Sequence, residues 1–256
     1  MDRLDSYLVT HNLVTSRSKG QYEIEKGNVL VNGKVVTKAS FKVSDEDQVM
    51  VKDAFDYVSR GALKLLKAKE VFSIDFNDKV MLDIGSSTGG FSEVALRNNI
   101  KKVIAVDVGK DQFDDKLKLD NRVELHEETD IRDYTVIDKI DIVTIDVSFI
   151  SVTKFIDKLG VINPSEIVLL IKPQFECGKD IADKYKGIPL NKEVHINVIN
   201  SIINSFCAIN YNIQDLTYSP ITGGSGNIEY LGYFTKDSKK EISIEQVIED
   251  SFKELK

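Results

Sequence analysis

The sequence predicts an α/β protein in which a small N-terminal α+β block precedes a larger domain built on a seven-stranded, mostly parallel sheet. After residue 79, apolar runs of strand length alternate with helical stretches, a pattern typical of a doubly wound sheet covered on both faces. The last two predicted strands are joined by the glycine-rich segment 222–226, so one of them should be antiparallel. Before residue 52 the predicted strands are much shorter and include a tight turn.

The N-terminal block, residues 1–51, should contain two helices and a few strands. Apolar residues in Leu4–Leu13 lie near helical spacing, Ser16 is placed to cap a second helix, and Gly27 to end it. Val29–Val31 reads as a strand that turns back at Asn32–Gly33. So few elements make a marginal core, and such a module usually exists to present a surface.

The second block alternates strand and helix, and we expect four segments in all. These are the first block at 1–51, a linker at 52–62, the sheet domain at 63–240 and a charged surface helix at 241–256. The expected strands of the sheet domain cover 79–84, 103–107, 123–126, 140–147, 166–171, 212–218 and 228–234, and its clearest helices cover 89–98 and 190–206.

Composition narrows the classes of function. No apolar run approaches the roughly 18 residues of a membrane span, and the N-terminus lacks the features of a secretory signal. Two cysteines without metal spacing favour a reducing cytoplasm, and three scattered histidines predict no metal site. The net charge of −7 argues mildly against a nucleic-acid partner. Residues 1–62, however, hold nine basic and nine acidic residues, so the whole excess lies beyond them.

A glycine-rich turn follows the first strand of the larger domain, where doubly wound sheets bind ligands. Gly85 would permit close backbone approach, and Gly89 would let the next helix pack tightly. Asp107 ends the following strand, 22 positions beyond Gly85, a spacing that suits hydrogen bonds to ribose hydroxyls. The second glycine of a dinucleotide motif is missing, which disfavours a nicotinamide enzyme, and there is no phosphate-binding P-loop.

Four charged residues are predicted to gather at one edge of this sheet: Lys64, Asp146, Lys172 and Glu229. Two ammonium and two carboxylate groups would be costly there unless they meet and take part in chemistry. The alternative to a catalytic group is that the four residues form two ordinary ion pairs at the edge of the sheet.

The first block resembles the alpha-L, or S4, RNA-binding motif in three strings: Arg3-Leu4-Asp5, Ser16-Arg17-Ser18 and the segment 27–33. The resemblance implies that a basic helix face contacts RNA phosphates through Arg3, Arg17 and Lys19, and we add Arg60 of the linker as a candidate. The alternative for these residues is that they are only solvated charges.

The glycine turn resembles the donor site of S-adenosylmethionine-dependent methyltransferases, within a Rossmann-like methyltransferase domain. The resemblance implies that Asp83 lies near the methionine part of the cofactor, Asp107 at the ribose and Asp130 at the adenine. The complete predicted cofactor set is Asp83, Gly85, Ser86, Gly89, Phe91, Asp107, Asp130 and Asp146.

The four charged residues resemble the Lys-Asp-Lys-Glu tetrad of FtsJ-like ribose 2′-O-methyltransferases. In this interpretation Lys172 orients a ribose hydroxyl and, if deprotonated, accepts its proton, because a nearby ammonium favours the oxyanion. Asp146 would lie next to the donor methyl, and Glu229 would orient both Lys172 and the substrate hydroxyl. Lys64 would contact the RNA or balance the carboxylates.

Together the two blocks resemble the haemolysin A (TlyA) family over essentially the whole chain. The resemblance implies 2′-O-methylation of cytidine in ribosomal RNA, within ribosomal subunits, with S-adenosylmethionine as the donor. Two alternatives remain: a non-catalytic RNA-binding or ribosome-assembly protein, and a membrane-active haemolysin, which the absence of a spanning or strongly amphipathic segment disfavours. The sequence leaves the modified nucleotide, the ribosomal subunit and the oligomeric state open.

Overall fold

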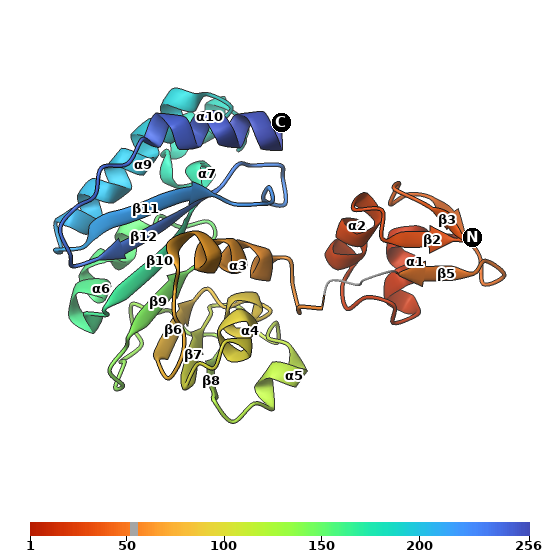
Figure 1. Ribbon diagram of the computed structural model, residues 1–256, viewed down its shortest axis with the longest axis horizontal. Coiled ribbons are helices and arrows are strands. Elements are labelled where there is room, and N and C mark those ends of the chain that lie inside the picture. The colour runs from red at the N-terminus through yellow and green to blue at the C-terminus, as the bar shows by residue number, and fades with distance from the viewer. Residues whose placement is uncertain (52–55) are drawn as a thin grey trace. The chain divides into compact units, whose positions relative to one another are not determined.

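A computed structural model describes residues 1–51 and 56–256 of the chain (Figure 1). The chain divides into two compact units, Met1–Ala62 and Leu63–Lys256, drawn in red to orange and in orange to blue. The predicted linker, 52–62, falls partly outside the described residues, and the part that is described belongs to the first unit.

In residues 1–51, the first unit contains two helices and five short strands. Strands β2 and β3 form a hairpin that β5 extends into a three-stranded antiparallel sheet, while β1 pairs with β4 in a separate two-stranded sheet. The predicted helices and hairpin are confirmed, but β1 and β4 were not expected. The elements are β1 Asp2–Arg3, α1 Leu4–Thr10, α2 Arg17–Glu25, β2 Val29–Val31, β3 Lys34–Val35, β4 Lys42–Val43 and β5 Val49–Val51.

Local chemistry explains where these elements begin and end. The Ser16 side chain accepts a hydrogen bond from the Lys19 backbone N–H and caps α2, as predicted. Gly27, with φ of +75°, adopts the left-handed conformation that commonly ends a helix. Asn32 and Gly33 have φ of +53° and +76°, the signs that a two-residue hairpin turn requires.

The second unit is a doubly wound sheet of seven strands in the order β11-β12-β10-β9-β6-β7-β8. Strand β12 runs opposite to the other six strands, because β11 and β10 both pair with it in antiparallel fashion and the other pairs are parallel. The predicted fold class and number of strands are confirmed. The strands are β6 Val80–Ile84, β7 Lys102–Val106, β8 Val123–His126, β9 Ile142–Ile145, β10 Glu166–Ile171, β11 Asn212–Tyr218 and β12 Tyr230–Thr235.

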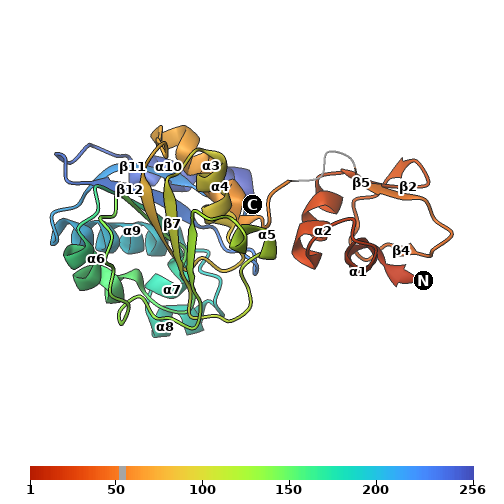
Figure 2. The ribbon, with the colours of Figure 1, turned by 90° about the horizontal axis from the view of Figure 1, so that it is seen from below.

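Helices cover both faces of this sheet. Helices α4 and α5 lie on one face and α6 and α9 on the other (Figure 2). The main core of buried aliphatic and aromatic side chains lies between the sheet and its helices. The helices are α3 Gly61–Phe72, α4 Gly90–Arg97, α5 Asp115–Lys118, η1 Val152–Phe155, α6 Ile156–Ile162, α7 Pro173–Glu176, α8 Lys179–Lys184, α9 Lys192–Cys207 and α10 Ile244–Leu255.

The C-terminal helix α10 packs against α9 and β11. It buries Ile248 and Ser251 while most of its charged residues stay exposed or half-buried, so the prediction of a charged surface helix is confirmed with the addition of an apolar inner face. Among the described residues, no helix combines the length and the apolar character that crossing a bilayer would demand.

The reversed direction of β12 positions the site. Ile171, at the end of β10, pairs with Tyr230, at the start of β12. On the other side of β10, Leu169 pairs with Ile145 at the end of β9. The residue after β9, the residue after β10 and the residue before β12 therefore meet at the carboxyl edge of the parallel strands.

Candidate active site

The four predicted charged residues converge at this edge. Lys172 Nζ lies 2.6 Å from Asp146 Oδ1, and Lys64 Nζ lies 2.7 Å from Glu229 Oε2. The two pairs are linked, because Lys64 Nζ is also 3.9 Å from Asp146 Oδ2. Lys64 comes from the first turn of α3, so a helix supplies one member and the sheet edge supplies three. The site is a connected group of two cations and two anions.

Three of these side chains are almost fully buried. The side chains of Lys64, Lys172 and Glu229 are 11%, 9% and 3% exposed, while the Asp146 side chain is 21% exposed. Buried charges lose their hydration and need partners, and each of these residues has at least one at ion-pair distance. Asp146 is the most accessible of the four, so a ligand could meet the group there.

The pairing differs from the one expected. The sequence suggested that Glu229 orients Lys172, but Glu229 contacts Lys64 and accepts a hydrogen bond of 3.2 Å from Gln174 Nε2. Lys172 instead pairs with Asp146 and donates to Ser148 Oγ at 2.9 Å. The reason is that Lys64, entering from α3, occupies the position next to the Glu229 carboxylate.

Ser148 and Gln174 were missed by the sequence analysis. Each follows a charged residue by two positions, Asp146 and Lys172 respectively, just beyond a strand end. Ser148 lies in the segment after β9, and Gln174 lies in the short helix α7 that begins at Pro173. Closeness in sequence to a predicted charged residue was the signal that could have found them.

A cavity of about 670 Å³ opens beside the tetrad. All four charged residues line it, together with Ser148 and Gln174. The remaining lining residues are Gly85, Ser87, Phe149, Phe175, Lys186, Gly187, Ile188, Gly223, Gly224, Ser225 and Asn227.

A second cavity of about 470 Å³ lies on the other side of Asp146. It runs past the ends of β6 and β7 and is lined by four of the predicted cofactor residues, Gly85, Asp107, Asp130 and Asp146. The two cavities share five lining residues: Gly85, Ser87, Asp146, Ser148 and Phe149. Two molecules, one in each cavity, would therefore face each other across Asp146.

Both glycines of the turn are required by the structure. A Cβ on Gly85 would lie 2.4 Å from the Asp146 carbonyl oxygen, and its φ is +81°. The absence of a side chain at Gly85 thus lets the turn after β6 approach the end of β9. It also lets a ligand in either cavity come close to the backbone of the turn. Gly89 has φ of +89°, and a Cβ there would lie 2.6 Å from Leu117 Cδ1, so the predicted tight packing before α4 is confirmed.

Four predicted cofactor residues do not line either cavity. Asp83, Ser86, Gly89 and Phe91 are buried and are outside the residues that line the two cavities. Asp83 accepts hydrogen bonds from Ser92 Oγ and Thr144 Oγ1, and burial raises its pKa to about 6. Asp83 therefore fastens β6 to β9 and α4.

The residues of the second cavity suit an adenosyl group. Asp107 accepts hydrogen bonds from the backbone N–H groups of Ser87 and Gly109, which fix its carboxylate at the rim. Asp130 forms an ion pair with Arg132, whose hydrogen bond lowers the pKa of Asp130. Within the described residues, the buried Ser86 Oγ has no hydrogen-bond partner, but Ser86 lies outside the residues that line this cavity. The anchored Asp107 carboxylate at the rim is the group that a polar ligand would meet.

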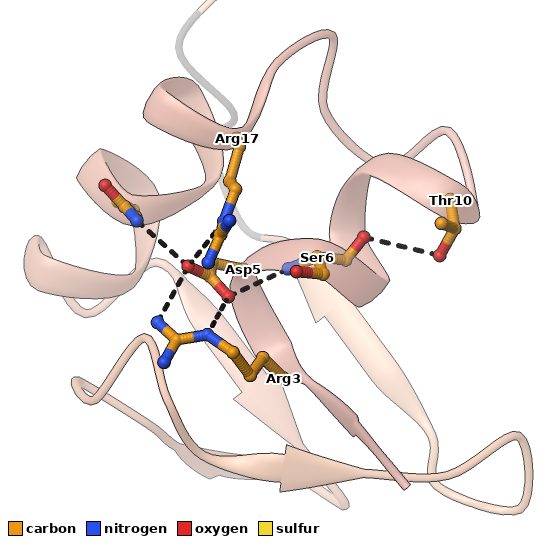
Figure 3. Close-up of polar contacts among 6 residues, drawn as sticks. Arg3, Asp5, Ser6, Thr10 and Arg17 are labelled. Carbon is orange, nitrogen blue, oxygen red and sulfur yellow. Dashed lines mark hydrogen bonds and ion pairs between the residues drawn. The ribbon is translucent and has the colours of Figure 1, made fainter.

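The four predicted RNA-contacting residues all lie in the first unit. Arg3 and Arg17 are 41% and 56% exposed along their side chains, and both donate to the buried Asp5 carboxylate (Figure 3). Lys19 is 8% exposed and donates to the Tyr57 carbonyl oxygen at 2.9 Å, so it fastens α2 to the segment that follows the first unit's sheets. Arg60 is half-buried.

Comparison with known proteins agrees with this geometry. Residues 57–236 match the model of the FtsJ-like methyltransferase family, and residues 2–49 match the S4 domain. Hemolysin A of Brachyspira hyodysenteriae is 40% identical, over 91% of this chain and 99% of its own length. The 23S rRNA (cytidine-2′-O)-methyltransferase TlyA of Campylobacter jejuni is 34% identical, over 90% and 98%.

A solved structure from Streptococcus thermophilus, provisionally named a hemolysin, superposes with a TM-score of 0.78. It is 34% identical and covers 99% of this chain and 96% of its own. Three findings lead to one assignment: the order of an S4 domain followed by an FtsJ-like domain, the identities over nearly full length, and the shared fold. The chain belongs to the haemolysin A (TlyA) family, and its second unit is an FtsJ-like methyltransferase domain.

Proposed function

We propose that the protein transfers a methyl group from S-adenosylmethionine to the 2′-hydroxyl of a cytidine in ribosomal RNA, within a ribosomal subunit. The observation that carries the proposal is the meeting of the two cavities at Asp146, beside Lys172. A donor in one cavity and a ribose in the other would bring the reacting atoms together, and such alignment supplies much of the rate enhancement. The relatives from Campylobacter jejuni and Mycobacterium tuberculosis, named as rRNA (cytidine-2′-O)-methyltransferases, support the choice of substrate.

The donor cavity fits the cofactor by residue type. Asp107 would accept hydrogen bonds from the ribose hydroxyls, and Asp130 would lie toward the adenine. Asp146 would face the cationic end, where its carboxylate stabilises a sulfonium. The bound cofactor supplies an electrophilic methyl group, and the residues of the chain supply the position and the charge around it.

Lys172 acts on the other reactant. Its Nζ is held by Asp146 and Ser148 at the wall of the larger cavity, where it can donate to the oxygen of a ribose hydroxyl. An ammonium at that point would stabilise the negative charge that develops on the ribose oxygen. If Lys172 instead begins as the neutral amine, it accepts the proton of the hydroxyl itself. Lys64 and Glu229 hold each other and so fix the wall on which the ribose rests. The substrate hydroxyl, and not a protein side chain, is the nucleophile.

The product of the reaction tests this proposal. Ribosomal subunits lacking the modification would be incubated with methyl-labelled cofactor and the purified protein, and the RNA digested to nucleosides. The expected product is labelled 2′-O-methylcytidine, and Lys172→Ala should abolish it. A label on a base, or full activity of Lys172→Ala, would overturn the assignment.

The same experiment separates the enzyme from a non-catalytic RNA-binding protein. Such a protein would bind the subunits without incorporating any label, and its affinity for the cofactor by calorimetry would be undetectable. Binding of the cofactor together with incorporation of the label excludes that alternative.

A further inference from the structure

The Asp5 carboxylate is a buried acid that lies between Arg3 and Arg17 of the first unit, and the three residues form the arginine cluster. Asp5 is 0% exposed and accepts five hydrogen bonds, from Arg3 Nε, Arg3 Nη2, Arg17 Nε, Gln21 Nε2 and the Ser6 backbone N–H, all between 2.9 and 3.0 Å. Arg3 binds both carboxylate oxygens in the bidentate manner that fixes a guanidinium in its plane (Figure 3). The pKa of Asp5 is strongly lowered, chiefly by the hydrogen bond from Arg3.

Asp5 fixes the two guanidinium groups while several of their N–H donors remain available to a ligand. Each arginine has five N–H donors, of which Arg3 gives two to Asp5 and Arg17 gives one. Both side chains remain about half exposed, so their other donors are accessible. Ordinary surface arginines lose side-chain entropy when they bind a ligand, whereas these two have lost much of it already.

The charge of the unit makes such an arrangement necessary. Residues 1–62 carry nine basic and nine acidic residues, so this part of the chain offers no net attraction to a polyanion. Attraction must come from local placement of cations. The trio of Arg3, Arg17 and Asp5 has a net charge of +1, with the anion buried and both cations accessible.

We propose that Asp5 is a positioning residue for RNA: it holds Arg3 and Arg17 in the orientation in which their free N–H groups bind a phosphodiester of the RNA backbone. The inference rests on the proposed function, since it takes RNA as the ligand of this surface. It adds that a negatively charged side chain increases affinity for a negatively charged partner, because it orders two cations.

The substitution Asp5→Asn tests this by the sign of its effect. It removes one negative charge, so if the arginines acted only as charges, RNA binding would become tighter. If Asp5 positions them, binding weakens, because the amide loses one acceptor oxygen and turns an N–H toward the guanidinium groups. Glu46→Gln is the matched control: it removes the same charge from an exposed residue of the same unit.

The measurement is the affinity of the full-length protein for transcribed ribosomal RNA at several salt concentrations, with folding checked by circular dichroism. We expect Asp5→Asn to bind about tenfold more weakly, with a salt slope smaller by about one phosphate contact. Glu46→Gln should bind as tightly as the wild type or more tightly. Unchanged or tighter binding by folded Asp5→Asn would overturn the inference.

Arg17→Lys gives a second test if Asp5→Asn does not fold. It keeps the charge of an exposed side chain but replaces the donor that lies 3.0 Å from Asp5 with a flexible ammonium. Weaker RNA binding at unchanged melting temperature supports positioning, and unchanged affinity contradicts it. Failure of the wild type to bind RNA would instead contradict the proposed function, so the two failures are distinguishable.

Discussion

Removing one carboxylate from the tetrad should destabilise the second unit by a measurable amount. Glu229→Gln keeps the shape of the side chain but removes the carboxylate nearest to the buried ammonium of Lys64. The other carboxylate of the tetrad that Lys64 contacts, Asp146, is 3.9 Å away. Breaking a buried ion pair from one side costs about 3–5 kcal/mol, because the remaining buried charge loses its nearest counter-charge. We therefore expect the free energy of unfolding to fall by about 3 kcal/mol.

The double variant separates this cost from the loss of ordinary packing. Lys64→Met alone should also cost about 3 kcal/mol, since it leaves the Glu229 carboxylate buried. Lys64→Met combined with Glu229→Gln removes both charges and should be less destabilised than the sum of the two by about 3 kcal/mol. Replacement of a whole buried pair is often neutral.

The assay is unfolding by urea, followed by far-ultraviolet circular dichroism because the chain has no tryptophan. The pair Lys79–Glu166 is the matched control: its atoms are 2.6 Å apart, but its side chains are 26% and 18% exposed, so Glu166→Gln should cost about 1 kcal/mol. If Glu229→Gln costs no more than Glu166→Gln, or the two tetrad substitutions simply add, the tetrad is not the coupled buried group described above.

Three further outcomes follow from single positions. Gly85→Ala should abolish cofactor binding by calorimetry and lower the melting temperature, because its Cβ would lie 2.4 Å from the Asp146 carbonyl oxygen at φ of +81°; binding of ordinary strength would contradict the close approach. Asp107→Asn should weaken cofactor binding by about tenfold and lower the melting temperature slightly, since the amide keeps an acceptor oxygen for only one of the two backbone N–H groups, Ser87 and Gly109. Equal affinity for the cofactor would contradict the ribose role. Burial raises the pKa of Asp83 from 3.8 to about 6, so between these values the folded state keeps a proton that the unfolded state has lost. Stability should therefore fall as pH rises through this window. Asp83→Asn should remove this fall from a plot of melting temperature against pH. A plot that is the same for the variant and the wild type would show that another group titrates there.

The sequence predicted the sheet and most of the site because the signals are local. A strand end followed by a charged residue, as at Ile145–Asp146 and Ile171–Lys172, can be read along the chain, and parallel strands bring such ends to one edge. The glycine turn at Gly85 is local in the same way, since its backbone φ and its motif depend on neighbouring residues.

The pairing within the site could not be predicted in this way. Glu229 lies next to Lys64, 165 positions away, because α3 enters above the edge where β12 begins. No periodicity encodes which of two lysines reaches a given carboxylate. The arginine cluster shows the same limit: Arg17 is 12 positions from Asp5, and only the packing of α2 against α1 joins them. The two-residue strands β1 and β4 were missed because so short a segment has no detectable alternation.

The central claim is that Lys172, held between Asp146 and Ser148 where the two cavities meet, acts on the ribose hydroxyl and not on the binding of the donor. Single-turnover methyl transfer by Lys172→Met, measured beside the affinity of the same variant for S-adenosylmethionine, tests this directly. We expect the transfer rate to fall by about a thousandfold or more while the donor affinity changes by less than about tenfold. A transfer rate close to that of the wild type, or a loss of rate fully explained by weaker donor binding, would contradict the account.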